Sequence, residues 1–119
     1  VVNIASIHAA LTKSNFSAYS TSKAALVGLT KSLAVELGSK VRFNAICPAA
    51  IDTPMLYEGF VDNPSNLKEL KKFHPTDTIG TISDVTNVVI FLANSDNTFL
   101  NGSILDLDGG IGNRLYDPQ

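Results

Sequence analysis

The sequence contains little of what builds disulfides, metal sites and nucleic-acid surfaces. Cys47 is the single cysteine, so no internal disulfide can form, which suits a reducing compartment. The two histidines, His8 and His74, stand far apart and no ligand spacing surrounds them, so we predict no metal site. The nine Lys and Arg residues are scattered, and the formal net charge is −2. We therefore expect no nucleic-acid partner.

Long apolar runs are also absent. No stretch reaches the roughly 20 residues of a membrane-spanning helix, and no signal peptide is visible, so we expect a soluble, cytoplasmic protein without a membrane partner. No serine stands in a nucleophile-elbow pattern, and Cys47 before Pro48 is more typical of a small buried residue than of a nucleophile. With 119 residues, 45% of them hydrophobic, the composition is that of one small globular domain.

What the sequence does contain is an alternation of strand and helix patterns. Residues 1–5 are apolar and β-branched and predict a buried parallel strand, after which the chain turns polar. A helix is predicted over residues 17–37, where leucines recur every three or four positions and Gly38 supplies a C-terminal stop. Residues 41–46 form the next predicted strand. Pro48 ends it, because proline has no N–H for a sheet ladder.

The second half of the sequence is less regular. Residues 56–80 are broken by glycine and proline, and only residues 67–73 favour one or two helical turns. Ser83 is predicted to cap a further helix, in which Asp84 adds negative charge to the first turn. Valines and a leucine at helical spacing supply its apolar face. Residues 103–107 predict a last strand.

Three polar residues near the start are suited to proton transfer. Tyr19 and Lys23 are four apart in the predicted helix, so their side chains share one face. An ammonium beside a phenol favours the phenolate and lowers its pKa from about 10. Ser6 follows the first strand, where its hydroxyl can hold a substrate oxygen against the phenol. Together they form a general acid/base apparatus for a carbonyl or an alcohol. An ordinary helix-face pair stays the alternative, because Tyr-x-x-x-Lys alone is common by chance.

Two further features lie near this predicted site. His8 stands two residues after Ser6 and is either a substrate contact or a loop histidine satisfied by local hydrogen bonds; the second interpretation is slightly favoured. Residues 48–55 follow the carboxyl end of the second strand, where open parallel sheets bind ligands. Free backbone groups and the Thr53 hydroxyl of this loop can hydrogen-bond an amide such as a nicotinamide carboxamide.

In their order and spacing these motifs resemble the short-chain dehydrogenase/reductase family, from its fifth strand to its C-terminus. The resemblance rests on Ser6, on the Tyr19-x-x-x-Lys23 (YxxxK) motif, on residues 44–48 and on Asp108-Gly109-Gly110. It implies an α/β fold with a Rossmann-like, doubly wound parallel sheet. This chain would supply its C-terminal portion, β-α-β-lid-α-β, as a single domain over residues 1–119, with one helix on each face of the sheet.

The resemblance also implies an activity and a role for each site residue. The enzyme would use NAD or NADP to interconvert a ketone and a secondary alcohol, with the hydride carried by the cofactor. Tyr19 would be the acid in reduction and the base in oxidation. Lys23 would lower the Tyr19 pKa and bind the nicotinamide ribose, and Ser6 would position the substrate oxygen. The nicotinamide end would be held by Tyr19, Lys23, Pro48, Ile51 and Thr53. Residues 56–80 would form a mobile lid.

The sequence departs from the family pattern in several places. No glycine-rich turn follows a strand, and the chain begins at Val1 inside a predicted strand, so we expect the N-terminal, phosphate-binding half to be missing from these residues. Ala49 replaces the glycine of the family's P-G-x-x-x-T loop, which requires a negative φ there. The runner-up function is therefore a non-catalytic remnant that acts as a structural or partner-dependent subunit.

An oligomer is a further implication of the resemblance. It implies a homodimer or homotetramer in which the long helix packs against its twin. Gly28 inside that helix marks either this close approach or a contact within the chain. The polar tail, residues 113–119, is expected to be loosely ordered or to reach a neighbouring subunit.

Overall fold

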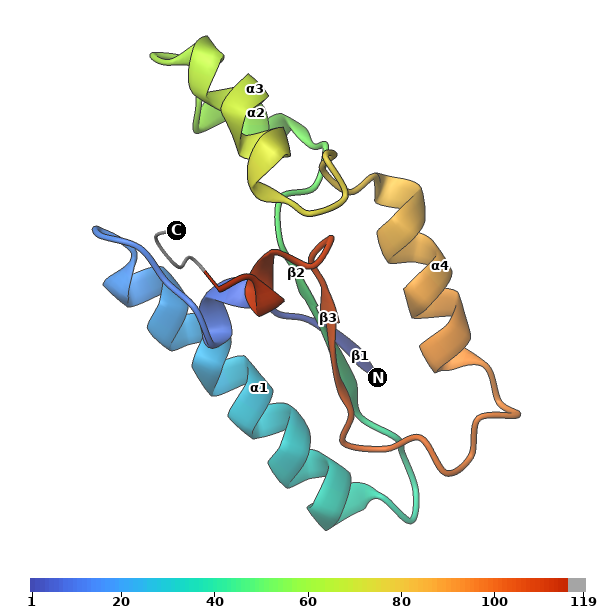
Figure 1. The fold of residues 1–119 in the computed structure, drawn as a ribbon. Coiled ribbons are helices and arrows are strands. Elements are labelled where there is room, and N and C mark those ends of the chain that lie inside the picture. Colours follow the sequence, from blue (N-terminus) through green and yellow to red (C-terminus); the bar gives the residue numbers. More distant parts are fainter. Residues whose placement is uncertain (116–119) are drawn as a thin grey trace.

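The computed structural model describes residues 1–115 and is built on a three-stranded parallel sheet (Figure 1). The strands β1 (Val2–Ile4), β2 (Asn44–Pro48) and β3 (Ile104–Leu107) lie in the order β1-β2-β3. All five residues of the central strand β2 are buried. The predicted α/β fold with a parallel sheet is thus confirmed.

The strand predictions need two corrections. β1 is only partly buried, and Ile4 is 42% exposed, because β1 lies at the edge of the sheet within residues 1–115. β2 begins at Asn44 rather than residue 41 and includes Pro48, which was expected to end it. Pro48 is tolerated as the last strand residue, opposite Leu107, where the next ladder bond is made by the N–H of Ala49.

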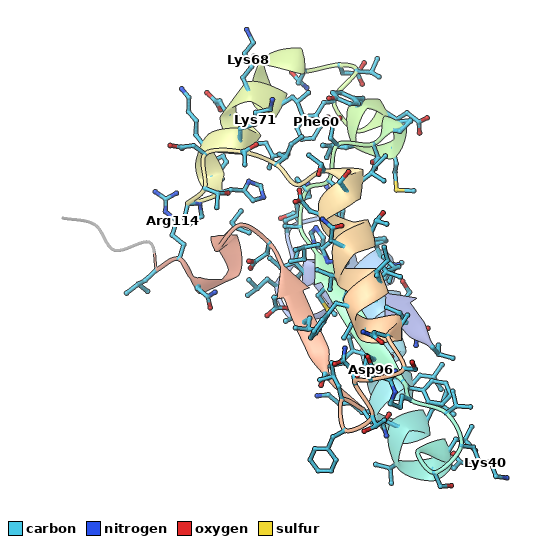
Figure 2. All side chains as sticks on the ribbon, turned by 90° about the vertical axis from the view of Figure 1, so that its right-hand side faces the viewer. Lys40, Phe60, Lys68, Lys71, Asp96 and Arg114 are labelled. Atoms are coloured by element: carbon cyan, nitrogen blue, oxygen red, sulfur yellow. The ribbon has the colours of Figure 1, made fainter. Side chains whose placement is uncertain are left out.

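Two long helices cover opposite faces of the sheet, as the two views in Figures 1 and 2 agree. They are α1 (Ser17–Leu37), between β1 and β2, and α4 (Ile82–Ala93), before β3. Because the strand order steps in one direction while the helices lie on opposite faces, the two crossovers have opposite hands. The crossover through α1 has the common right-handed form, and the crossover through α4 is left-handed. One helix on each face was the expected arrangement.

Helix α1 is tied to β1 by a buried hydrogen bond and ends at a closely packed glycine. Near its middle, the fully buried Thr30 hydroxyl accepts a hydrogen bond from Nδ2 of Asn3 on β1 at 2.9 Å. At its end, Gly38 adopts a right-handed φ of −58°, so it is not the left-handed glycine cap that the sequence suggested. A Cβ at Gly38 would collide with the carbonyl of Ala34 and lie 2.7 Å from Nδ2 of Asn101. Close packing, not a positive φ, explains this glycine.

The N-cap of helix α4 lies two residues before the predicted one. Thr81, not Ser83, is the N-cap, and it forms a capping box with Asp84. The Thr81 hydroxyl accepts from the N–H of Asp84 at 3.2 Å, and the Asp84 carboxylate accepts from the N–H of Thr81 at 2.7 Å. This N–H, and then the Thr81 hydroxyl, hold the pKa of Asp84 below its ordinary value. On the inner face Leu92 is 1% exposed, as the apolar spacing predicted.

Residues 52–79 leave the sheet after β2 and return to the same place, forming the arm that projects beyond the strands in Figure 1. We call this arm the lid. It contains two helices, α2 (Pro54–Glu58) and α3 (Pro64–Phe73), which is more helix than was predicted. At its base Ile51 forms a parallel bridge with Gly80. The N–H of Asp52 donates to the Gly80 carbonyl at 2.8 Å, so the two limbs of the lid are tied together.

Within residues 1–115 no helix is both long enough and apolar enough to cross a lipid bilayer.

Candidate active site

The predicted catalytic residues Ser6, Tyr19 and Lys23 come from the end of β1 and the first two turns of α1. Ser6 directly follows the buried Ala5, is 6% exposed and caps a short 3-10 helix, Ile7–Ala9. Its Oγ accepts a hydrogen bond from the N–H of His8 at 3.2 Å. Because this bond uses a lone pair of Oγ, the Ser6 proton is still available to donate to another oxygen.

Tyr19 lies in the first turn of α1 with its ring 41% exposed. The edge of the ring packs against His8, with centroids 5.6 Å apart, and against Phe16 at 5.9 Å. No residue in the range 1–115 hydrogen-bonds its phenol oxygen, so the aromatic contacts fix the ring and leave the hydroxyl accessible.

Lys23 joins the end of β1 to the Tyr19 ring. Its Nζ donates to the Ile4 carbonyl at 3.1 Å and lies 5.6 Å from the centroid of the Tyr19 ring. The second distance is within the range of a cation–π contact. The i, i+4 spacing therefore does place the ammonium and the phenol ring side by side, and the carbonyl before Ala5 holds the ammonium there.

His8 is the aromatic centre of this cluster. Its ring stacks on the ring of Phe16 with centroids 4.7 Å apart. Nζ of Lys13 lies over the same Phe16 ring, 4.4 Å from its centroid. Nδ1 of His8 is buried and has no hydrogen-bond partner within residues 1–115. The favoured interpretation, a histidine satisfied by local hydrogen bonds, is therefore wrong for this nitrogen. Burial, and then the Lys13 charge, lower the His8 pKa from 6.5.

The loop after β2 is shaped by its own hydrogen bonds. Thr53 caps α2: its Oγ1 accepts from the N–H of Leu56 at 3.4 Å and donates to the Ile51 carbonyl at 3.3 Å. The hydroxyl predicted to bind an amide therefore begins a lid helix and keeps one lone pair for a ligand. Ile51 lies at the hinge of the lid, and Pro48 is buried at the end of β2. The structure thus places Pro48 at the carboxyl end of β2, and Ile51 and Thr53 just beyond it.

The substitution of Ala49 for glycine causes no backbone strain. Within residues 1–115 the non-glycine residues with positive φ are Asn15 and Asp77 alone. The φ of Ala49 is therefore not in the left-handed region, which satisfies the condition that the sequence set.

The sequence did not reveal a pocket of about 270 Å³ behind Ser6, between α1 and the sheet. Cys47 and Ser6 line it together with Lys31 and Asp106. Cys47 is buried, as expected, and its burial raises the pKa of its thiol, partly offset by the backbone N–H of Ser6. No spacing in the sequence joins these residues, since they come from four separate segments: the cap of the first 3-10 helix, α1, β2 and β3. Within the described residues no group of three His, Cys, Asp or Glu can hold a metal ion.

Comparison with known proteins assigns this arrangement to a family. Residues 1–112 match the family model described as enoyl-(acyl carrier protein) reductase. Proteins named as short-chain dehydrogenase/reductase (SDR) family members are among the matching relatives. The chain belongs to the SDR family. The resemblance drawn from its motifs is thereby confirmed.

The alignments with individual relatives extend over almost all of this SDR chain. A 2-(R)-hydroxypropyl-CoM dehydrogenase of Xanthobacter autotrophicus is 43% identical over 110 residues, covering 92% of this chain and 44% of the relative. The ligand-free aldohexose dehydrogenase of Thermoplasma acidophilum superposes with a TM-score of 0.92 at 38% identity, over 99% of this chain and 50% of that one. ElxO with NADP bound superposes with a TM-score of 0.84 at 35% sequence identity, over 95% of this chain and 46% of that one. The chain thus spans about half the length of these relatives.

Proposed function

We propose that the protein containing this SDR chain is an NAD(P)-dependent oxidoreductase that interconverts a ketone and a secondary alcohol. The observation that carries the proposal is the contact of Lys23 with both the end of β1 and the ring of Tyr19. This contact holds the Lys23 ammonium beside the Tyr19 phenol, at the end of the strand that Ser6 follows. The names of the relatives, several of which are dehydrogenases, and the NADP bound to ElxO support the same reaction class.

The residues present fit the nicotinamide end of such a cofactor. Lys23 has three N–H donors and uses one on the Ile4 carbonyl, so two are left for the hydroxyls of a ribose. Pro48 lies at the carboxyl end of β2, and Ile51 and the free lone pair of Thr53 lie just beyond it, where open sheets bind ligands. When bound, NAD(P)H supplies the hydride that no side chain can supply. No glycine-rich turn for its pyrophosphate occurs in this sequence.

The three side chains divide the remaining work between them. In reduction, Ser6 donates its free hydroxyl proton in a hydrogen bond to the substrate carbonyl oxygen, which stabilises the charge that develops there. Tyr19 then gives its phenol proton to that oxygen, and Lys23 stabilises the resulting negative phenol oxygen. In oxidation Tyr19 takes the proton back from the alcohol.

The proposal is tested by Tyr19→Phe in the natural protein. General acid–base catalysis contributes roughly 10²–10⁴-fold, so we expect kcat/KM to fall by about that factor while NAD(P)H still binds. Cofactor fluorescence in the same variant provides the binding measurement. Turnover equal to that of the natural protein would show that Tyr19 is not the acid. Absence of turnover in the natural protein itself would favour the runner-up, a non-catalytic subunit.

We also propose that the protein is a homo-oligomer that pairs through α1. A Cβ added at Gly28 meets no atom within 4 Å, so this glycine serves no contact within residues 1–115. Leu29 is 50% exposed and Val35 is 89% exposed on the same helix. Apolar side chains exposed around a glycine favour a close partner helix, and this observation supports the first of the two explanations that the sequence left open.

A further inference from the structure

Three aromatic rings gather where α1 begins, those of His8, Phe16 and Tyr19. The rings of His8 and Phe16 are stacked, with centroids 4.7 Å apart and planes inclined by 21°. The ring of Tyr19 stands across this pair, at interplanar angles of 78° to His8 and 84° to Phe16. The centroid distances of 5.6 and 5.9 Å lie in the favourable range for edge-to-face pairs. We call His8 and Phe16 the aromatic clamp of Tyr19.

The backbone at this point gives Tyr19 little support. Tyr19 lies in the first turn of α1, whose N-cap is Phe16, and no side chain makes a capping hydrogen bond there. The first turn also contains no acidic residue that would interact favourably with the helix dipole. Asn15, just before the cap, has a φ of +68°, so the chain enters the helix through a left-handed residue. Helix ends without a cap fray, so the packing of side chains is what holds this turn in place.

The phenol group of Tyr19 is not held by hydrogen bonds either. Its oxygen has no hydrogen-bond partner within residues 1–115. Nζ of Lys23 lies 5.6 Å from the centroid of the ring and is itself fixed by the Ile4 carbonyl. The ring contacts that set the direction of the phenol are therefore those with the clamp and with Lys23.

His8 also links the clamp to Ser6. It belongs to the 3-10 helix Ile7–Ala9, which lies against α1 (Figure 1). The N–H of His8 donates to Oγ of Ser6 at 3.2 Å, while its ring contacts the ring of Tyr19. One residue therefore touches both of the groups that we propose to meet at the substrate oxygen. A displacement of about 1 Å between reacting groups can lower a rate roughly 10²-fold, so the placement of these two groups matters for the rate.

Building on the proposed function, we propose that His8 and Phe16 are positioning residues, whose rings clamp Tyr19 so that its phenol faces the substrate oxygen beside Ser6. The clamp requires an aromatic ring at residue 8 and no chemistry from the imidazole. Nδ1 of His8 is buried without a hydrogen-bond partner within residues 1–115, so a phenyl ring in its place loses no bond of this nitrogen. The bond to Ser6 comes from the backbone of His8 and does not depend on the side chain. Because the clamp acts on the phenol, its loss is expected to lower kcat and to spare cofactor binding.

The first experiment measures the reduction of a small activated ketone, 2,3-butanedione, by the natural protein and its variants with NADPH or NADH. We expect kcat, counted per molecule that binds cofactor, to fall roughly tenfold or more in His8→Ala, while the KM for the cofactor stays nearly unchanged. His8→Phe returns an aromatic ring and is expected to recover most of the lost kcat. If His8→Ala fails to fold, Phe16→Leu keeps apolar bulk but removes the stacked ring, and its kcat is expected to fall several-fold. Thr12→Ala, an exposed position of the same loop outside the ring cluster, is the matched control and is expected to leave kcat unchanged.

A second measurement needs no turnover. Growth with 3-fluorotyrosine gives each tyrosine of the natural protein a fluorine resonance, and the resonance that is missing in Tyr19→Phe belongs to Tyr19. We expect the rings of the clamp to displace this resonance from that of free fluorotyrosine. It is expected to move toward the free value in His8→Ala and in Phe16→Leu, and to stay displaced in His8→Phe.

The outcomes separate the clamp from the reaction it serves. An unchanged kcat in His8→Ala overturns the inference, because the rings would then support folding only. Equal losses of kcat in His8→Phe and His8→Ala overturn it as well, since the imidazole would then act through a polar contact, such as one with substrate. A Tyr19 resonance that does not move in His8→Ala has the same consequence. Absence of turnover in the natural protein contradicts the proposed function instead, and the Tyr19 resonance then decides alone whether the clamp holds the ring.

Discussion

His8 and His74 each bury one ring nitrogen that has no hydrogen-bond partner within residues 1–115. An unsatisfied buried polar atom costs about 1–3 kcal/mol, so such atoms are few in folded proteins. The other buried polar side chains show how this chain normally avoids the cost. Thr30 pairs with Asn3, and Asn44 donates to the Leu100 carbonyl at 2.9 Å. The two histidines thus differ from the structural polar residues. His74 lies at the end of α3 in the lid, and His8 stays a candidate substrate contact beside Tyr19.

The environment of His8 leads to a prediction about pH. Because burial and the charge of Lys13 lower its pKa in the folded state, the unfolded chain takes up the proton first as the pH falls. The contribution of neutral His8 to the free energy of unfolding is therefore complete above the ordinary pKa of 6.5. It is lost as the pH falls from 6.5 to the lowered pKa of the folded state. We expect His8→Gln to flatten this part of the curve of thermal midpoint against pH, measured from pH 5 to 8. An unchanged slope in the variant would assign the effect to other groups.

Among the elements, the start of α4 shows how one residue pair fixes a boundary. The Thr81–Asp84 capping box places the first turn of α4 against Gly80, where the lid returns to the sheet. The cap thus determines where the lid ends as well as where the helix begins. Ser83, the cap that the sequence suggested, is exposed within the helix and contributes no capping bond.

We predict that Thr81→Ala lowers the thermal midpoint of the natural protein and that Ser83→Ala leaves it nearly unchanged. The reason is that Thr81→Ala removes the hydroxyl that accepts from the N–H of Asp84. The low pKa of Asp84 adds a test by pH, because its share of the stability is present above the ordinary pKa of 3.8 and is lost as the pH falls below that value. Asp84→Asn is expected to remove this acid-side loss. A larger effect from Ser83→Ala would show that the cap is misplaced.

The elements that local pattern determines were predicted well, and those that depend on distant contacts were not. The leucine spacing predicted the bounds of α1, and the Tyr19–Lys23 spacing placed two site residues on one face. The bond from Lys23 to the Ile4 carbonyl joins residues nineteen apart and has no signature in the sequence. The burial of His74 has none either, because it depends on the lid folding back onto the end of β3.

At the scale of the whole molecule, two of the exposed apolar surfaces of the described chain bear on assembly. One is the edge strand β1, where Ile4 is 42% exposed, and the other is α1, where Leu29 and Val35 are exposed. The chain spans about half the length of its relatives, and the open edge of β1 is where further strands can continue a parallel sheet. The surface of α1 lies on a helix rather than at this edge, so a second copy of the protein is the partner that we propose for it. Residues 116–119 of the polar tail, which we expected to be loosely ordered or to reach a neighbouring subunit, lie outside the described residues.

The variant Gly28→Leu separates folding from assembly in this last proposal. Within residues 1–115 a new side chain at Gly28 has open space, and leucine has a higher helix propensity than glycine, which is about 0.8–1 kcal/mol less favourable than alanine, so the subunit itself gains stability. In a pair of closely packed α1 helices the same side chain keeps the two backbones apart. We therefore expect light scattering after gel filtration to report a smaller mass for Gly28→Leu, and an intermediate effect for Gly28→Ala. An unchanged mass together with a higher thermal midpoint would show that α1 faces solvent in the assembled protein, and the oligomer would then have to form through another surface.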